Sequence, residues 1–289
     1  MAVSSIASLL PDSPKNDLTP IPAHCEKHGD YMANRMASPL GGKPITFGCR
    51  QCQDERVAAE KAREAADAAR AAEEKQRKAL DRAGIPTRFR NRSFDNYEAN
   101  TPAKQHALTV AKSFAENFKE NYDAGRCLIF SGKTGNGKTH LANAIANHII
   151  GKGWSPFFIG VRELVGTVKA TWNKRSEKSE IQVIREYVNQ HLLIIDEIGV
   201  QFDSDAERMI LFDVINGRYE EELPTIILSN YPIESTDGPS IRKVLGDRVL
   251  DRLRENGGKI VQFNWESYRA SASKTERPQF ERRAGKIAD

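Results

Sequence analysis

The chain has 289 residues, of which 39% are hydrophobic and 28% charged, and its 43 basic and 39 acidic side chains leave a net charge of +4. This composition is typical of one large globular domain with a smaller appendage, and the charge alone is too mild to indicate nucleic-acid binding. No apolar run approaches the roughly 20 residues that span a bilayer, and no basic segment followed by an apolar core marks a secretory signal. We therefore expect a cytoplasmic protein, in which cysteines are more typical of metal ligands or buried thiols than of disulfides.

Two short motifs near the start of the chain each contain two possible metal ligands. Each separates two metal-binding side chains by two residues: Cys25 with His28, and Cys49 with Cys52. Three thiolates and one imidazole are typical of a closed, tetrahedral, structural Zn²⁺ site. We therefore predict a zinc-knuckle module over residues 23–53 that docks a partner protein. Two unrelated pairs on a flexible arm are the alternative, and His24 ranks below His28 as a ligand.

Three further stretches are rich in polar residues or alanine. Residues 1–22 combine several prolines with polar residues and are expected to be flexible, although residues 6–10 also have the apolar pattern of a short docking segment. Residues 54–83 interleave alanine with opposite charges and lack a heptad seam, which favours a solvated helical spacer. Residues 270–289 are polar and mildly basic, as is typical of a disordered tail.

Residues 88–97 mix aromatic and arginine side chains just before the predicted core. Such a segment can bind nucleic acid by stacking and phosphate contact. More often it packs its rings on the domain that follows, and its position favours a strap near the adenine of a nucleotide. Residues 103–122 then show the apolar spacing of an amphipathic helix.

The most specific motif is a phosphate loop, G-x-x-x-x-G-K-[ST], over residues 132–139. A short apolar strand (residues 127–130) precedes it and a helix (residues 140–147) follows, so a phosphate would lie at a helix N-terminus. The ammonium of Lys138 can reach the β- and γ-phosphates, and the hydroxyl of Thr139 can bind Mg²⁺. The loop backbone supplies the remaining contacts: Gly132, Thr134, Gly135, Asn136 and Gly137. A chance glycine-rich turn is the alternative.

The rest of the core alternates strands with helices, which predicts an α/β fold with a parallel sheet of five strands. Besides the strand before the phosphate loop, we expect strands at residues 155–159, 191–197, 224–230 and 259–263. We expect helices at residues 161–170, 181–189, 207–221 and 245–254.

Several polar residues follow buried strands, where ligands of parallel sheets bind. Asp196 suits Mg²⁺, and Glu197 suits polarising an attacking water. Asn230 would orient this water or contact the γ-phosphate, or it only caps a turn. Arg248 and Arg252 share one helix face, where they are either solvated or reach the γ-phosphate of a neighbouring chain.

Residues 194–199, 225–230, 246–252 and 263–269, together with the phosphate loop, resemble the DnaC-type helicase loaders, AAA+ ATPases close to the initiator DnaA. The resemblance covers about residues 84–269, and it implies an Mg²⁺-dependent ATPase that hydrolyses ATP. It also implies the following roles: Lys138 and Thr139 as the Walker A pair, Asp196 and Glu197 as Walker B, Asn230 as sensor 1, Arg252 as the arginine finger and Arg269 as sensor 2.

The same resemblance implies a function in replication initiation. The chain would deliver a DnaB-type replicative helicase onto single-stranded DNA and would assemble into an ATP-dependent spiral or ring. The family places a DNA-binding helix where residues 168–180 stand here, with four candidate contacts: Lys169, Trp172, Lys174 and Arg175. The zinc module and spacer are similar to phage-borne relatives, which points to a bacterial or phage-infected host. An IstB-like transposition regulator and a nucleotide-switched adaptor with little turnover are the alternatives.

Overall fold

The computed structural model describes residues 18–38, 43–199 and 204–267. Contacts divide the chain into a first unit, residues 1–74, and a second unit, residues 75–289, and we describe each by itself. The predicted lead-in at residues 1–22 lies outside the described residues except for residues 18–22. Arg269 and the predicted tail also lie outside them.

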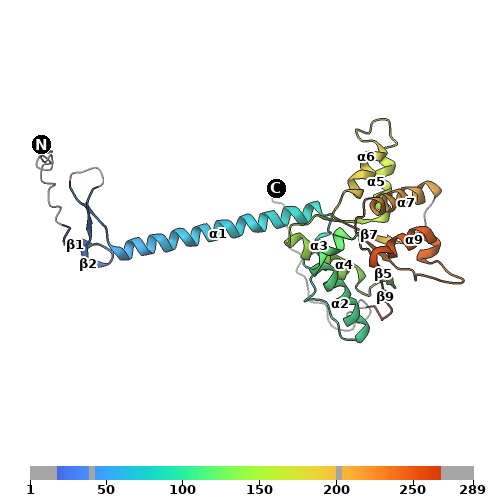
Figure 1. Cartoon of the computed structure of the whole chain (residues 1–289), viewed down its shortest axis with the longest axis horizontal. Helices are drawn as coiled ribbons and strands as arrows, with labels where there is room; N and C mark the ends of the chain where they lie inside the picture. The colour runs from blue at the N-terminus through green and yellow to red at the C-terminus, as the bar shows by residue number, and fades with distance from the viewer. Residues whose placement is uncertain (1–17, 39–42, 200–203, 268–289) are drawn as a thin grey trace, which may run out of the picture. The chain divides into compact units, whose positions relative to one another are not determined.

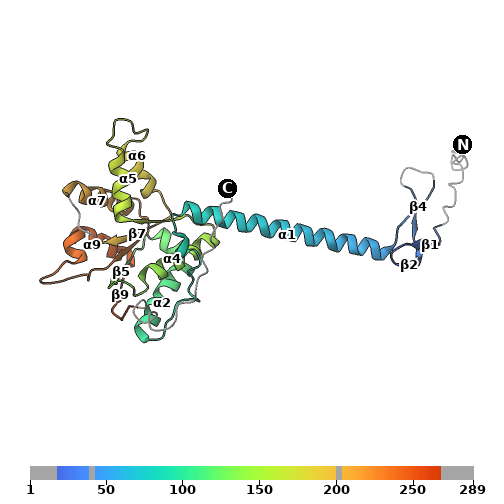
Figure 2. The same ribbon diagram turned by 180° about the vertical axis from the view of Figure 1, so that it is seen from behind.

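The first unit contains two small antiparallel hairpins that the sequence did not predict (Figure 2). Strand β1 (Ile21–Cys25) pairs with β2 (Gly29–Ala33), and β3 (Arg35–Met36) pairs with β4 (Ile45–Thr46). Among the described residues of this unit only Ala33 and Cys49 are buried. The apolar core is therefore too small to account for the fold of this unit by itself.

Helix α1 (Arg50–Arg82) begins four residues before the predicted spacer and contains 33 residues, none of them buried. High helix propensity and i,i+4 ion pairs, such as Arg63 with Asp67, favour the helix, and in its last turns Ala79 and Leu80 pack on an apolar cluster of the second unit. Its early start places Cys52 in the first turns of the helix. The division between the two units falls inside α1.

The second unit is built on a five-stranded parallel sheet in the order β6-β7-β8-β5-β9, which confirms the predicted α/β fold (Figure 1). Its strands are β5 (Leu128–Gly132), β6 (Pro156–Gly160), β7 (Leu192–Ile198), β8 (Thr225–Ser229) and β9 (Lys259–Phe263). Strand β5 lies between β8 and β9. Because all the strands run the same way, the residues that follow β5, β7 and β8 meet at one edge of the sheet.

Helices cover both faces of this sheet. Leu128 and Phe130 of β5 pack in one apolar cluster with α4, whereas Ile129 points to the other cluster, which includes α5 and α7. The first face carries α2 (Pro102–Glu116), α3 (Phe118–Asp123) and α4 (Lys138–Gly151). The second carries α5 (Val161–Ala170), α6 (Glu180–Val188), α7 (Asp205–Glu220) and α9 (Asp247–Arg254). Short helices η1 (Thr87–Phe89), α8 (Ile241–Leu245) and η2 (Glu255–Gly257) complete the unit.

One predicted helix is divided in two, and another begins later than predicted. The helix expected over residues 103–122 breaks at Asn117, which has a φ of −100° and a ψ of +33°, and whose backbone amide and side chain both donate to the carbonyl of Ser113. The helix expected over residues 245–254 begins two residues later, as α9, because Gly246 has a φ of +79° and separates it from the short helix α8. Within the described residues, no helix is long and apolar enough to cross a membrane.

Candidate nucleotide site and metal centre

The phosphate loop joins the end of β5 to the start of α4, as the motif requires. Gly135 and Gly137 have φ values of +86° and +91°, which side chains rarely adopt. At Gly137 an added Cβ would also lie 2.8 Å from the ring of Tyr97. The loop therefore requires glycine at both positions, and it presents the N-terminus of α4 to a bound anion.

Lys138 is buried beneath this loop. Its ammonium donates hydrogen bonds to the carbonyls of Gly132, at 2.5 Å, and Lys133, at 2.9 Å. Burial lowers the pKa of Lys138 to about 8, while the nearby Asp196 carboxylate acts in the opposite direction. A phosphate group would supply the negative charge that this buried cation lacks.

Thr139 and Asp196 form an oxygen pair that suits Mg²⁺. The Thr139 hydroxyl donates to Asp196 Oδ2 at 3.0 Å, although the two residues are 57 positions apart. Burial raises the pKa of Asp196, and hydrogen bonds from the Glu197 amide and from Thr139 oppose this rise. A hard cation such as Mg²⁺ prefers oxygen ligands and would bind between the two side chains, in place of the hydrogen bond that joins them. Glu197 and Asn230 are exposed near the same sheet edge, where the sequence predicts that a lytic water would bind.

The side chain of Asn136 makes contacts that the phosphate-loop motif did not predict. Its side-chain amide donates to the carbonyls of Phe263, at 2.7 Å, and Trp265, at 2.5 Å, and its own carbonyl accepts from the Trp265 indole at 2.9 Å. The side chain therefore fastens the loop to the segment after β9 instead of facing a phosphate. No local pattern predicts this contact, because 129 positions separate Asn136 from Trp265.

The aromatic strap packs on α4, as its position predicted. The ring of Tyr97 meets the His140 ring edge-on, at 5.3 Å between centroids. Asn147 of α4 donates to three backbone carbonyls of the strap, those of Phe89, Arg90 and Arg92. The Tyr97 hydroxyl is buried and has no hydrogen-bond partner among the described residues.

The predicted arginine finger lies far from the phosphate loop of its own chain. The guanidinium of Arg252 lies 4.7 Å from the ring centroid of Tyr219 and lines a small pocket with Cys127 and Thr225. These two residues mark the amino ends of β5 and β8, whereas the phosphate loop follows the carboxyl end of β5. Any action of Arg252 on a γ-phosphate therefore requires a second chain. Arg248 is exposed on the same helix.

A cavity of about 1400 Å³ adjoins the phosphate loop, and its lining includes Lys133, Thr134 and Asn230. Arg254, which the sequence analysis did not single out, lines it as well. Arg254 is two residues after Arg252. Residues two apart on a helix do not share a face, so the two side chains have different surroundings. Their spacing in the sequence could therefore have predicted that the two arginines lie in different surroundings.

The four candidate DNA contacts are unequal. Lys169 forms an ion pair with Glu207 at 3.0 Å, so its charge is largely compensated. Trp172 is 51% exposed, and its indole donates to Glu180 at 2.6 Å. Lys174 and Arg175 are exposed. The expected helix over residues 168–180 is wrong: α5 ends at Ala170, and turns connect it to α6.

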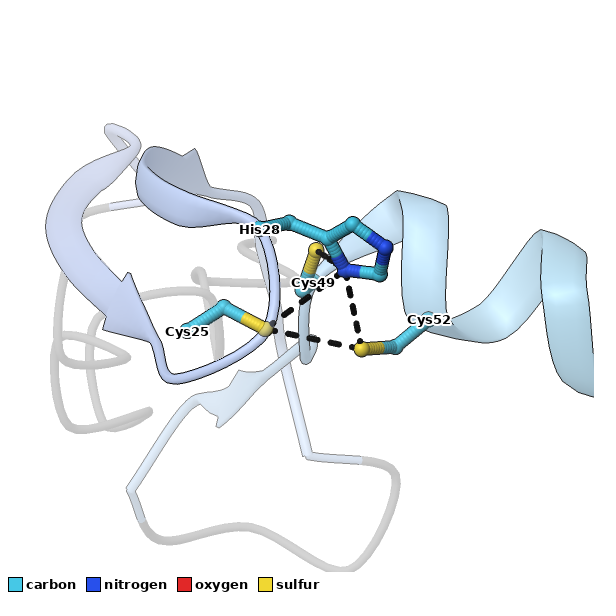
Figure 3. Close-up of side chains that lie close together, drawn as sticks. All are labelled: Cys25, His28, Cys49 and Cys52. Carbon is cyan, nitrogen blue, oxygen red and sulfur yellow. Dashed lines mark hydrogen bonds between the residues drawn. The ribbon is translucent and has the colours of Figure 1, made fainter.

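The first unit brings the four predicted metal ligands together, with all their donor atoms within 4.8 Å of one another (Figure 3). His28 Nδ1 lies 3.2 Å from Cys52 Sγ, 3.6 Å from Cys49 Sγ and 3.7 Å from Cys25 Sγ. The Sγ atoms of Cys25 and Cys52 are 3.5 Å apart. Ligands around a tetrahedral Zn²⁺ are separated by about 3.5–3.8 Å, given typical zinc–ligand bond lengths. The donor set and its spacing fit Zn²⁺.

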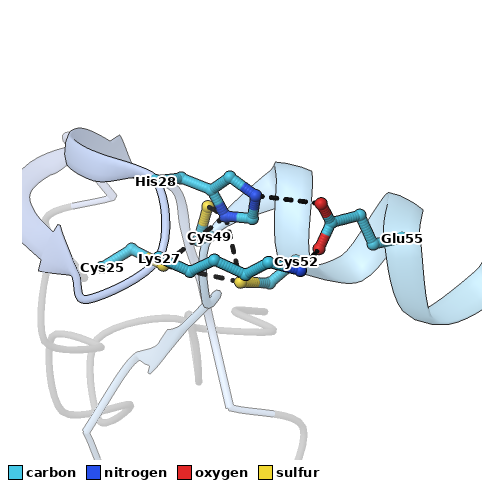
Figure 4. Close-up of polar contacts among 6 residues, drawn as sticks. All are labelled: Cys25, Lys27, His28, Cys49, Cys52 and Glu55. Atoms are coloured by element: carbon cyan, nitrogen blue, oxygen red, sulfur yellow. Dashed lines mark hydrogen bonds and ion pairs between the residues drawn. The ribbon is translucent and has the colours of Figure 1, made fainter.

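A carboxylate that the sequence analysis missed supports this centre. Glu55 accepts a hydrogen bond from His28 Nε2 at 3.1 Å and forms an ion pair with Lys27 (Figure 4). The imidazole thus turns Nδ1 toward the sulfurs and Nε2 toward a carboxylate, an arrangement typical of metal-bound histidine. The signal was available, because Glu55 follows Cys52 by three residues and so shares its helix face.

The thiols of Cys25 and Cys52 differ in pKa. The backbone amides of Lys27 and His28, and then the Cys52 thiol, lower the pKa of Cys25 to about 6. The Cys25 thiolate in turn raises the pKa of Cys52 to about 11. Cys25 therefore ionises first. A divalent cation would allow both thiols to ionise.

The sheet, the phosphate loop and the Thr139–Asp196 pair define the second unit as an AAA+ ATP-binding domain. Residues 54–276 match the profile of the family described as IstB-like ATP binding protein, and the chain belongs to that family. It is also 37% identical over 202 residues to the replicative helicase loader DnaC of Escherichia coli K12, covering 70% of this chain and 79% of that protein. The chain is therefore homologous to DnaC-type helicase loaders, which confirms the resemblance.

Two further comparisons agree. A protein of Escherichia coli K12 named uncharacterized protein YdaV is 33% identical over 192 residues, which cover 66% of this chain and 73% of the relative. The crystal structure of the DnaC helicase loader matches with a TM-score of 0.53 and 26% identity, over 61% of this chain and 99% of that one.

Proposed function

We propose that this protein uses ATP to deliver a DnaB-type replicative helicase onto single-stranded DNA. The observation that carries the proposal is the buried site formed by Lys138, Thr139 and Asp196 in a homologue of DnaC. Lys138 binds the β- and γ-phosphates, and Thr139 and Asp196 hold Mg²⁺, which neutralises phosphate charge during hydrolysis. The loop backbone, from Gly132 to Gly137, encloses the phosphates.

Hydrolysis of ATP also requires residues other than those that bind the phosphates and Mg²⁺. Glu197 orients and polarises the attacking water, and Asn230 holds the water or the γ-phosphate. Arg252 acts on the nucleotide of a neighbouring chain, because it lies at the opposite end of the strands from the phosphate loop of its own chain. This role requires the chains to assemble, and we propose a spiral or ring. Arg269 keeps its predicted role as sensor 2 and lies outside the described residues.

The two remaining surfaces serve the partners of the protein. The zinc module, with Cys25, His28, Cys49 and Cys52 as ligands, binds the helicase. Trp172, Lys174 and Arg175 bind single-stranded DNA by base stacking and phosphate contact. Lys169 contributes less because Glu207 pairs with it.

A transfer assay tests the function. Replicative helicase from the same cell is mixed with circular single-stranded DNA and the full chain, and helicase bound to the circle is measured. We expect ATP and the protein together to increase bound helicase about tenfold or more, and Lys138→Ala to abolish the increase. The function is wrong if the intact chain binds ATP and leaves helicase transfer unchanged.

The family match favours one second candidate, an IstB-like regulator of transposition. In that role the chain would act together with a transposase, and its DNA substrate would be a duplex. ATP-dependent binding to duplex DNA, stronger than binding to single strands and without helicase capture, would select this candidate.

A further inference from the structure

Strands β5, β7 and β8 carry the residues of the nucleotide site, and several contacts connect the ends of these strands. Strand β7 pairs with β8 through Ile195 and Ile227, but the next registered pair is Ile198 with Ser229. Strand β7 thus has one extra residue, a β-bulge that holds Asp196 and Glu197. Glu197 occupies this bulge with a φ of +63°, in the left-handed region that favours glycine.

One buried hydroxyl closes this bulge. Ser229 Oγ donates to the Ile198 carbonyl at 2.5 Å and accepts from the Tyr231 amide at 3.1 Å. Ser229 is 1% exposed, so water does not replace either bond. The same side chain therefore connects the residue after Glu197 to the residue after Asn230.

Tyr231 is fixed at two more points. Its carbonyl accepts from the Ser131 hydroxyl at 2.8 Å, and Ser131 directly precedes the glycine that begins the phosphate loop. Its ring lies against Gly199, where an added Cβ would come within 2.6 Å of the ring, and Gly199 has a φ of +118°. Asn230, between Ser229 and Tyr231, is exposed with both its neighbours fixed.

We propose that Ser131, Ser229 and Tyr231 form a strand-end bridge that positions Glu197 for hydrolysis. The bridge joins the phosphate loop, the turn of Asn230 and the glutamate-bearing bulge, and Ser229 is its central positioning residue. It holds Glu197 in a left-handed backbone conformation that is unfavourable for a residue with a side chain. The inference rests on the proposed ATPase function and deepens it, since it assigns residues that set the geometry of the water-polarising carboxylate.

The test is Ser229→Ala, measured against Ser240→Ala. Ser240 is equally buried, 1% exposed, and its hydroxyl only caps α8 by accepting from the Lys243 amide. We expect Ser229→Ala to lower kcat for ATP hydrolysis about tenfold or more and to leave ATP affinity within about twofold. In a Glu197→Gln background the Ser229 substitution should lower kcat no further. Ser240→Ala should leave both quantities near their original values.

A second readout needs no turnover. Amide hydrogen exchange in residues 195–199 should become about fivefold faster or more in Ser229→Ala, and not in Ser240→Ala. Unchanged exchange in Ser229→Ala overturns the bridge, as does an unchanged kcat or an equal loss of affinity and kcat. If the intact chain hydrolyses no ATP, the proposed function fails, and the exchange measurement still decides on the bridge.

Discussion

The two units of this protein are stabilised in different ways. The ATP-binding unit surrounds its sheet with two large apolar clusters, one on each face. The first unit buries only Ala33 and Cys49 among its described residues, and four metal-binding side chains converge at its centre. The comparison indicates that apolar burial determines the fold of the second unit, whereas a metal bound by these four side chains would determine the fold of the first, so that the two units should fail under different treatments.

Zinc removal should have the largest effect, and only on the first unit. Structural Zn²⁺ contributes about 10–16 kcal/mol to the folding of small zinc domains. We expect one Zn²⁺ per chain by metal analysis, and loss of the β1–β2 and β3–β4 hairpins after chelation, seen by hydrogen exchange. ATP affinity should stay within about twofold, because the apolar clusters of the second unit hold its site.

Cys49→Ser should reproduce this loss, and Cys127→Ser is the matched control. Cys127 is buried in the second unit and is not a predicted ligand. A chain that holds no zinc and keeps both hairpins would contradict the metal centre.

The next effect is on hydrolysis. Arg252→Ala should lower kcat by about 10³-fold, since an arginine finger contributes 10³–10⁵ in kcat. Mixing these chains with Glu197→Gln chains should restore part of the activity, because each then supplies the group that the other lacks. Arg208→Ala, at an exposed arginine on α7, is the control. A monomer with full activity would remove Arg252 from the site.

A smaller effect is expected on nucleotide binding. Lys138→Ala should weaken ATP affinity about a hundredfold, or about 2.7 kcal/mol, since hydrogen bonds to charged groups contribute about 1.5–3 kcal/mol each. Titration with a fluorescent ATP analogue measures the change. Lys133→Ala, in the same loop, should change affinity by less than about threefold. Normal binding by the Lys138 variant would refute the assignment of the loop.

The smallest effect concerns DNA. Trp172→Ala should weaken single-strand binding about tenfold, since stacking contributes about 1–3 kcal/mol per base. Anisotropy of a labelled oligonucleotide measures this, and Met209→Ala, which removes another exposed apolar side chain, is the control. Equal affinities of the two variants would place the DNA surface elsewhere.

The same contrast explains what the sequence could predict. Local patterns sufficed for the buried strands, the phosphate loop and the clustering of Cys25, His28, Cys49 and Cys52, because each has a recognisable pattern along the chain. The break at Asn117 was not predicted, because the apolar spacing continues from Phe114 and Ala115 of α2 to Phe118 of α3.

Contacts between distant segments were beyond prediction. The side chain of Asn136 binds carbonyls more than 120 positions away, and its place in the phosphate-loop motif does not predict this contact. The contact of Tyr231 with Gly199 likewise requires the register of β7 and β8 to be known. Such contacts follow from the packing of the sheet and not from any local pattern.

The most direct test of the account is helicase capture by a chain whose zinc ligands are changed. In Cys49→Ser/Cys52→Ser, the account predicts that ATP hydrolysis stays within about twofold while helicase capture falls about a hundredfold, because partner binding and nucleotide binding belong to different units. Cys127→Ser should preserve both activities. If the doubly substituted chain captures and transfers helicase as well as the intact protein, the zinc module does not bind the helicase and the central claim is wrong.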